Sequence, residues 1–259
     1  MAVALTIAGS DPSGGAGIQA DLKTFHQCGV YGEAVITLLT VQNTLGVQRV
    51  EFLPPHLVRD QLQAVLDDIP PHAVKTGALG SAEIVRAVAR AAAEFRFPLV
   101  VDPILAPSQG QPLAAGAALD AIRDELLPRA TLLTPNLPEA EALTGIQIRG
   151  PEELRRAAEC LRSRGAGAVL IKGGHGDGPA TDVLLDGAGW HEFSASRLTA
   201  RHTHGTGCTY SAAITAGLAC GLPLLEAVER AKRFVHEAIR TAPGLGRGCG
   251  PLNHHARLS

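Results

Sequence analysis

Short apolar segments alternate along the chain with longer segments in which apolar residues recur every three or four positions. The first kind predicts buried strands, and the second predicts amphipathic helices. Strands are predicted at residues 2–9, 33–42, 72–77, 98–103, 130–136, 168–174, 181–187 and 189–195, the last two forming a hairpin. Helices are predicted at residues 17–29, 56–69, 81–95, 115–127, 137–145, 150–165, 207–221 and 222–242.

This alternation of apolar strands with helices indicates an α/β protein with a mostly parallel sheet and helices on both faces. No linker, repeat or low-complexity segment divides the sequence, so residues 1–259 are expected to form a single domain. The helix at 207–221 is apolar nearly all round and should lie inside the molecule. Most of the unusual loops follow strands, where open parallel sheets bind their ligands. This order favours an enzyme over a scaffold.

Composition excludes several classes of protein. Of the 259 residues 46% are hydrophobic and 19% charged, which argues against disorder, and a net charge of −2 gives no reason to expect a nucleic-acid partner. No apolar run is long enough for a membrane span, and the five cysteines include no C-x-x-C pair. We therefore expect a soluble cytoplasmic protein with reduced thiols. Lysine is rare, at four residues against nineteen arginines, so each lysine is a candidate for a specific role.

Two stretches in the first fifth of the chain predict a pocket for a small polar molecule. Residues 8–25 (AGSDPSGGAGIQADLKTF) place a glycine-rich turn between a strand and a helix, without the spacing of a P-loop. Asp21 on that helix could accept a hydrogen bond from a ligand, or it could be an ordinary solvated residue beside a tight turn. Gln42 and Asn43 follow a strand, and their amides either pair with a heteroaromatic ring or form a polar turn.

Two later strand ends carry residues suited to binding a metal and phosphate. Asn136 and Glu139 lie three apart at the start of a helix, where they could hold a hydrated Mg²⁺ or simply cap the helix. Capping is the commoner use of this pattern. Lys172 ends a strand and is followed by glycines, so it could reach over phosphate groups or be a basic residue of a turn.

The stretch THGTGCTYSAAI places a glycine turn and a thiol at the start of the apolar helix. Gly205, Thr206, Gly207 and Cys208 would present consecutive backbone N–H groups, which favour an anion at a helix N-terminus. The same field predicts a lowered pKa for Cys208, whose thiolate could accept the proton of an attacking hydroxyl. The alternative is a small side chain that only packs. Together the five stretches supply the groups that a small-molecule kinase needs.

The segments AGSDPSGGAGIQADLKTF, QNTLGV, KTGAL, TPNLPEAEALTG, IKGGH and HGTGCTYSAAI resemble the bacterial hydroxymethylpyrimidine kinase/phosphomethylpyrimidine kinase family of the ribokinase-like superfamily. The resemblance covers residues from about 5 to about 254. It implies a three-layer α/β/α ribokinase-like fold. It also implies phosphorylation of 4-amino-5-hydroxymethyl-2-methylpyrimidine, and then of its monophosphate, by MgATP in thiamine biosynthesis.

The resemblance also assigns expected roles to individual residues. The pyrimidine pocket would contain Gly9, Asp21, Val41, Gln42 and Ala78. The anion hole would be Gly205–Cys208 with Cys208 as the base, and Asn136 and Glu139 would serve Mg²⁺. The nucleotide would be bound by Asn136, Lys172, Thr206 and Asn253.

Ala78 departs from the family pattern, which often has methionine there, and a roomier pocket makes a pyridoxal or pyridoxine kinase the alternative. A pyrimidine-binding protein without catalysis is the other alternative. A homodimer is expected.

Overall fold

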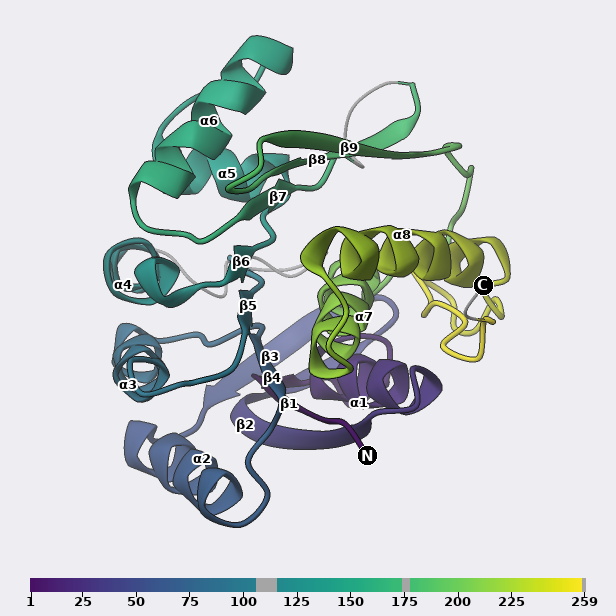
Figure 1. The fold of residues 1–259 in the computed structure, drawn as a ribbon. Helices are drawn as coiled ribbons and strands as arrows, with labels where there is room; N and C mark the ends of the chain where they lie inside the picture. Colours follow the sequence, from purple (N-terminus) through teal and green to yellow (C-terminus); the bar gives the residue numbers. More distant parts are fainter. Residues whose placement is uncertain (106–115, 174–177, 258–259) are drawn as a thin grey trace.

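The computed structural model describes residues 1–105, 116–173 and 178–257, which fold as shown in Figure 1. The strands are β1 (Val3–Ser10), β2 (Tyr31–Asn43), β3 (Gly46–Phe52), β4 (Ala73–Thr76), β5 (Leu99–Val101), β6 (Leu132–Leu133), β7 (Val169–Ile171), β8 (Ala180–Leu185) and β9 (Trp190–Ala195). The helices are α1 (Gly17–Gln27), α2 (Pro55–Asp68), α3 (Ala82–Ala92), α4 (Ala117–Ala121), α5 (Leu137–Thr144), α6 (Pro151–Ser163), α7 (Thr206–Ala219) and α8 (Leu224–Arg240). Beyond α4 the chain stays helical through η1 (Ile122–Leu126) and η2 (Leu127–Arg129).

All described strands belong to one sheet with the order β3-β2-β1-β4-β5-β6-β7-β8-β9. Neighbouring strands from β2 to β7 pair in parallel, whereas β3, β8 and β9 are antiparallel additions at the two edges. The carboxyl ends of the parallel strands therefore meet at one edge of the sheet. The predicted mostly parallel α/β sheet is confirmed.

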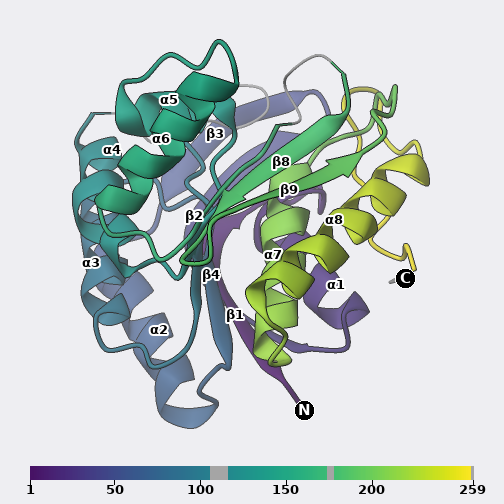
Figure 2. The ribbon, with the colours of Figure 1, turned by 45° about the horizontal axis from the view of Figure 1, so that its top comes forward.

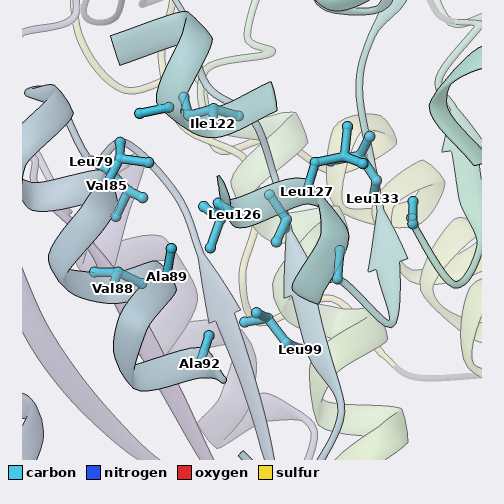
Figure 3. Close-up of a cluster of buried hydrophobic side chains, with 14 of the residues drawn as sticks. Leu79, Val85, Val88, Ala89, Ala92, Leu99, Ile122, Leu126, Leu127 and Leu133 are labelled. Atoms are coloured by element: carbon cyan, nitrogen blue, oxygen red, sulfur yellow. The ribbon is translucent and has the colours of Figure 1, made fainter. Parts of the chain in front are cut away.

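Helices cover both faces of the sheet, as Figures 1 and 2 show. Helices α2 to α6 lie on one face, and α1, α7 and α8 lie on the other. The larger apolar core fills the first interface, and Figure 3 shows how Val85, Val88 and Ala89 of α3 face Leu126 and Leu127 of the following helical segments. Two smaller cores pack α1, α7 and α8 against the opposite face. From its third residue onward α7 is buried except at one leucine, which agrees with its predicted interior position.

Strand β3 is absent from the sequence-based prediction, which interprets residues 40–46 as a loop and assigns nothing to 46–52. None of its residues is buried because it lies at the edge of the sheet, so it has no apolar run to mark it. The start of the helix predicted at 115–127 and the last residue of the strand predicted at 168–174 lie outside the described residues, as does the histidine of IKGGH. Among the described helices, none combines the length and the apolar character needed to span a lipid bilayer.

Candidate active site

The N-terminal end of α7 meets the loop that follows β1. Gly205 has a positive φ of 82° and precedes the helix, and a Cβ atom there would overlap the carbonyl oxygen of Gly15. Glycine at 205 thus permits the close approach of two segments far apart in the sequence. The Thr206 N–H donates to the Thr203 carbonyl at 3.2 Å, whereas those of Gly207 and Cys208 reach no carbonyl in the described ranges. These two amides are the donors an anion would meet.

Cys208 is buried at this helix end, and its thiol does not have the lowered pKa predicted from the sequence. Burial raises the pKa of Cys208 to about 12, against the opposing effects of nearby Lys75 and a hydrogen bond from the Gly17 backbone. The prediction was wrong because it counted the helix field and not the loss of water around a buried thiolate. Without a ligand, Cys208 is a thiol at neutral pH.

Asp21, predicted to bind substrate, lies on α1 with a fully buried side chain. Its carboxylate accepts hydrogen bonds from Lys75 Nζ at 2.7 Å and from Thr6 Oγ1 at 2.6 Å. Burial opposes the charge of Lys75, but the neighbouring Asp21 carboxylate raises the pKa of Lys75 above its usual value. Asp21 is therefore neither a solvated helix residue nor open to a ligand in this conformation. It holds a buried cation near Cys208.

Lys172 forms a second ion pair beside the α7 end. Its Nζ lies 2.8 Å from Asp102 Oδ1, and a Cβ atom at Gly207 would lie 3.4 Å from Nζ and 3.8 Å from Asp102 Oδ2. The lysine, the aspartate and the Gly207 amide thus share one small region. Burial opposes both charges, yet each partner favours the charge of the other, so the pKa of Lys172 is raised and that of Asp102 lowered. This arrangement suits binding of a multiply charged anion.

Asn136 and Glu139 form the capping box that the sequence allowed as the alternative to a metal site. Asn136 Oδ1 accepts from the Glu139 N–H at 2.9 Å, and Glu139 Oε2 accepts from the Asn136 N–H at 2.8 Å. Among the described residues there is no group of three or more metal-ligating side chains. Burial raises the pKa of Glu139 to about 7, opposed by Lys172 and supported by nearby Asp102. Two carboxylates within each other's field fit a hydrated Mg²⁺, which needs only one or two of them.

The predicted pyrimidine-binding residues lie around the carboxyl ends of β1, β2 and β4. Gly9 is buried where a side chain would collide with Leu38, and Ala78 accepts a hydrogen bond from Thr37 Oγ1 through its carbonyl. Val41 is 43% exposed on β2. Gln42 follows it across a register shift between β2 and β3, and its amide lies 3.2 Å from the imidazole of His204. Of this group, Gln42 has the clearest link to the α7 end.

Asn253 is held by its own surroundings. Its Nδ2 donates to Thr241 Oγ1 at 3.0 Å and its Oδ1 accepts from the His255 N–H, while its backbone N–H donates to the Ala238 carbonyl of α8. Among the described residues, no hydrogen bond joins this side chain to Lys172, Asn136 or the start of α7. Its expected role in nucleotide binding remains a prediction.

Four residues of this region, Asp11, Lys75, Asp102 and His204, are absent from the residues predicted from the sequence. Two of them carry a signal that was available. Lys75 interrupts a short apolar strand, and a lysine in a buried strand needs a partner; Asp102 ends an apolar strand before a proline. Asp11 and His204 flank glycine-rich turns and have no comparable signal.

Paired backbone amides and a lysine at one helix end are a means by which enzymes offset negative charge on a transferred phosphoryl group. The fold and this site define the class of phosphoryl-transfer enzymes with an open parallel sheet. The family model described as phosphomethylpyrimidine kinase matches residues 11–253, and the chain belongs to this family. The predicted family and the prediction of a kinase are confirmed.

Relatives agree with this assignment. The chain is 51% identical over 252 residues to the "Thiamine biosynthesis bifunctional protein ThiED" of Geobacter sulfurreducens, covering 96% of this chain but 51% of that protein's length. It is 49% identical over 260 residues to the hydroxymethylpyrimidine/phosphomethylpyrimidine kinase of Rhizobium meliloti, covering 99% and 98% of the two chains.

Solved structures show the same architecture. An ADP complex of Bacillus subtilis pyridoxal kinase superimposes with a TM-score of 0.92 at 38% identity, covering 99% of this chain and 98% of that one. The phosphomethylpyrimidine kinase of Clostridium difficile 630 superimposes with a TM-score of 0.83 at 42% identity, covering 92% and 100%. Similarity therefore extends to kinases named for two different heterocycles.

Proposed function

We propose that this protein transfers a phosphoryl group from ATP to the hydroxymethyl group of 4-amino-5-hydroxymethyl-2-methylpyrimidine, and then to the resulting monophosphate, for thiamine biosynthesis. The observation that carries the proposal is the convergence of the Gly207 and Cys208 amides with the Lys172–Asp102 pair. The two amides and Lys172 would stabilise negative charge on the phosphoryl group during transfer, which is most of what a kinase site has to do. Family membership supplies the substrate class.

Most of the predicted residues, although not Asp21 or Asn253, have a place in this mechanism. Lys172 would leave Asp102 in part to bind the phosphates of ATP, with the Thr206 side chain beside it. Cys208 would take the proton of the substrate hydroxyl, and Lys75 together with the Gly17 N–H lowers the cost of its thiolate. Gln42, with Gly9, Val41 and Ala78 nearby, would bind the pyrimidine ring. Asn136 and Glu139 would hold a hydrated Mg²⁺, which supplies further positive charge to the phosphates.

Two further aspects of the proposal concern the state of the protein. A cytoplasmic location is supported by the scattered cysteines without C-x-x-C spacing. A homodimer is supported by large apolar side chains that stay exposed on β2, on β3 and in the turn between them: Leu39, Val41, Leu45 and Phe52. Exposed apolar residues gathered on one edge are typical of an association surface.

A pyridoxal kinase is the second candidate, because the B. subtilis pyridoxal kinase superimposes over nearly the whole chain and Ala78, just after β4, has a small side chain. The purified protein should be given MgATP with the pyrimidine, its monophosphate or pyridoxal, and products identified by mass spectrometry. The proposal expects the highest kcat/KM with the pyrimidine and a diphosphate as the final product. A higher kcat/KM with pyridoxal would favour the second candidate, and no phosphorylated product would favour a binding protein.

The role of Cys208 is tested by C208A. We expect kcat to fall by about 10²-fold or more, with little change in the Kd of the pyrimidine, because general-base catalysis contributes on that order and acts in the transition state. Cys220, exposed at the other end of α7, is the matched control, and C220A should keep wild-type turnover. An unchanged kcat in C208A would mean that the thiol of Cys208 only packs and is not the base.

A further inference from the structure

His204 lies where three segments distant in the sequence meet beside the start of α7. Its buried Nε2 is 2.8 Å from Asp11 Oδ2 and 3.2 Å from the side-chain nitrogen of Gln42. Its backbone N–H donates to the Gly250 carbonyl at 3.1 Å. A side chain at Gly15 would meet the imidazole at 2.5 Å, so glycine there leaves room for the ring. One nitrogen atom thus contacts both the predicted pyrimidine-binding residue and the loop after β1.

The carboxylate of Asp11 acts only as a hydrogen-bond acceptor in this arrangement. Besides His204, its carboxylate accepts from Ser13 Oγ at 2.7 Å and from the backbone N–H groups of Ser13, Gly15 and Ala16 at 2.8, 3.2 and 2.9 Å. Burial raises its pKa, but the hydrogen bonds from His204 and Ser13 outweigh burial and bring it to about 2. Asp11 is therefore ionised at neutral pH. The contact with His204 then requires that the proton lie on Nε2 of the imidazole.

A protonated Nε2 has no lone pair and accepts nothing from Gln42. The atom of Gln42 beside it must be the amide oxygen, because the two ends of a glutamine amide are alike in shape and the hydrogen-bond network decides between them. In that orientation the NH₂ group lies about 3.3 Å from Thr40 Oγ1. Thr40 gives its own proton to the Ser10 carbonyl at 3.0 Å and so has a lone pair free to accept. The Nε2–H of His204 is then shared between Asp11 Oδ2 and the Gln42 oxygen, and Thr40 Oγ1 accepts one of the two amide protons of Gln42.

We infer that Asp11 and His204 are positioning residues that fix the amide of Gln42 with its oxygen on His204, leaving one N–H for an acceptor nitrogen of the substrate ring. The second amide proton is then available to a ligand, and a pyrimidine ring offers acceptor nitrogens. The identity of the ring rests on the proposed function. The tautomer and the amide orientation do not.

Long-range ¹H–¹⁵N NMR spectra of the ligand-free protein, labelled with ¹⁵N-histidine, read the tautomer directly. We expect His204 to carry a proton on Nε2 at neutral pH, its signals being assigned by their loss in H204Q. A His204 ring protonated on Nδ1 alone would overturn the inference. This measurement uses no substrate, so its outcome is independent of whether the proposed function holds.

Two substitutions at 204 separate hydrogen bonding from packing. H204Q places an amide N–H near the position of Nε2, whereas H204L removes the donor. For H204L we expect the hydroxymethylpyrimidine substrate to show a Kd and a KM that are about tenfold higher, as for loss of one buried hydrogen bond, while the KM for ATP stays unchanged. H204Q should remain within about threefold of wild type. His191, which pairs with Asp186 at 3.3 Å on the β8–β9 hairpin, is the control, and H191L should change neither constant.

The Q42A background shows whether His204 acts through Gln42. There, H204L should raise the Kd of the pyrimidine no further, because the residue it positions is already gone. Equal effects of H204L and H204Q in the wild-type background, or a full tenfold effect of H204L in Q42A, would contradict the inference. If the wild type binds no pyrimidine, the proposed function fails, but the NMR result still decides the tautomer. If H204L does not fold, the NMR spectra and the binding constants of H204Q still test the inference.

Discussion

Two buried aspartate–lysine pairs flank the start of α7, and they differ in their access to solvent. Asp21 and Lys75 are both 0% exposed, with 2.7 Å between them. Asp102 is also buried, but Lys172, 2.8 Å away, keeps 14% of its side chain exposed. The same chemical pair thus occurs once sealed beneath Cys208 and once open beside Gly207.

The difference in access separates two roles. A sealed pair cannot exchange its partner for a ligand, so Lys75 serves as a fixed positive charge near the thiol. An open pair can exchange, and Asp102 would still accept hydrogen bonds from Ser211 at 3.1 Å and Thr134 at 3.2 Å when Lys172 moves to a phosphate. The comparison predicts that breaking the first pair harms stability and breaking the second harms turnover.

The largest effect is expected for K75M. Removing the lysine leaves the Asp21 carboxylate buried with Thr6 as its other donor, so the free energy of unfolding should fall by about 3–5 kcal/mol in urea titration. Adding D21L to K75M should recover part of this loss. E237Q, which breaks an exposed pair with Arg240, is the control and should leave the urea midpoint unchanged. A K75M protein as stable as wild type would show that the sealed pair is not ionised.

K172M should act mainly on catalysis. We expect kcat/KM for ATP to fall about 10²–10³-fold, the usual cost of losing one group that stabilises transition-state charge. The urea midpoint should fall less than in K75M, since Ser211 and Thr134 still donate to Asp102. K232M, which breaks a comparable pair between α8 and Asp182, is the matched control for a partly exposed lysine. An equal loss of turnover in K232M would show that Lys172 has no special role in catalysis.

Asp11 extends the comparison to a buried carboxylate whose side-chain partners include a histidine. Its pKa is lowered from 3.8 to about 2, so its charge stabilises the folded state above pH 3.8, and this contribution is lost as the pH falls through about 2. D11A should therefore lower the free energy of unfolding by about 2 kcal/mol at pH 7, and the gap to wild type should close near pH 2. Urea titrations at both pH values measure it. A gap that stays constant with pH would mean that packing, and not charge, holds Asp11.

Much of the fold follows from local patterns, and so do parts of the site. The capping box of Asn136 and Glu139, the alternative to a metal site in the sequence analysis, needs only four consecutive residues and appears in the structure. The scarcity of lysine is also informative: Lys75, Lys172 and Lys232 each pair with a buried aspartate. These features could be predicted because they depend on residues close together in the sequence or on the overall composition.

What could not be predicted depends on groups that are distant in the sequence. The pKa of Cys208 was predicted in the wrong direction because burial by α1 and β4 is invisible in the stretch GTGC. His204 and Asp11, 193 positions apart, have no pattern that would connect them. Strand β3 was missed because an edge strand with exposed residues lacks an apolar run. In each case tertiary contact decided the outcome.

The overlap that any side chain at Gly205 would have with the Gly15 carbonyl has a consequence for biosynthesis of the molecule. The first loop and the start of α7 are complementary halves of one cradle, and the second half leaves the ribosome long after the first. Closing so large a loop is slow, so the sheet can assemble before the cradle exists. The protein should therefore become able to bind phosphate late in folding, after most of the helices have packed against the sheet.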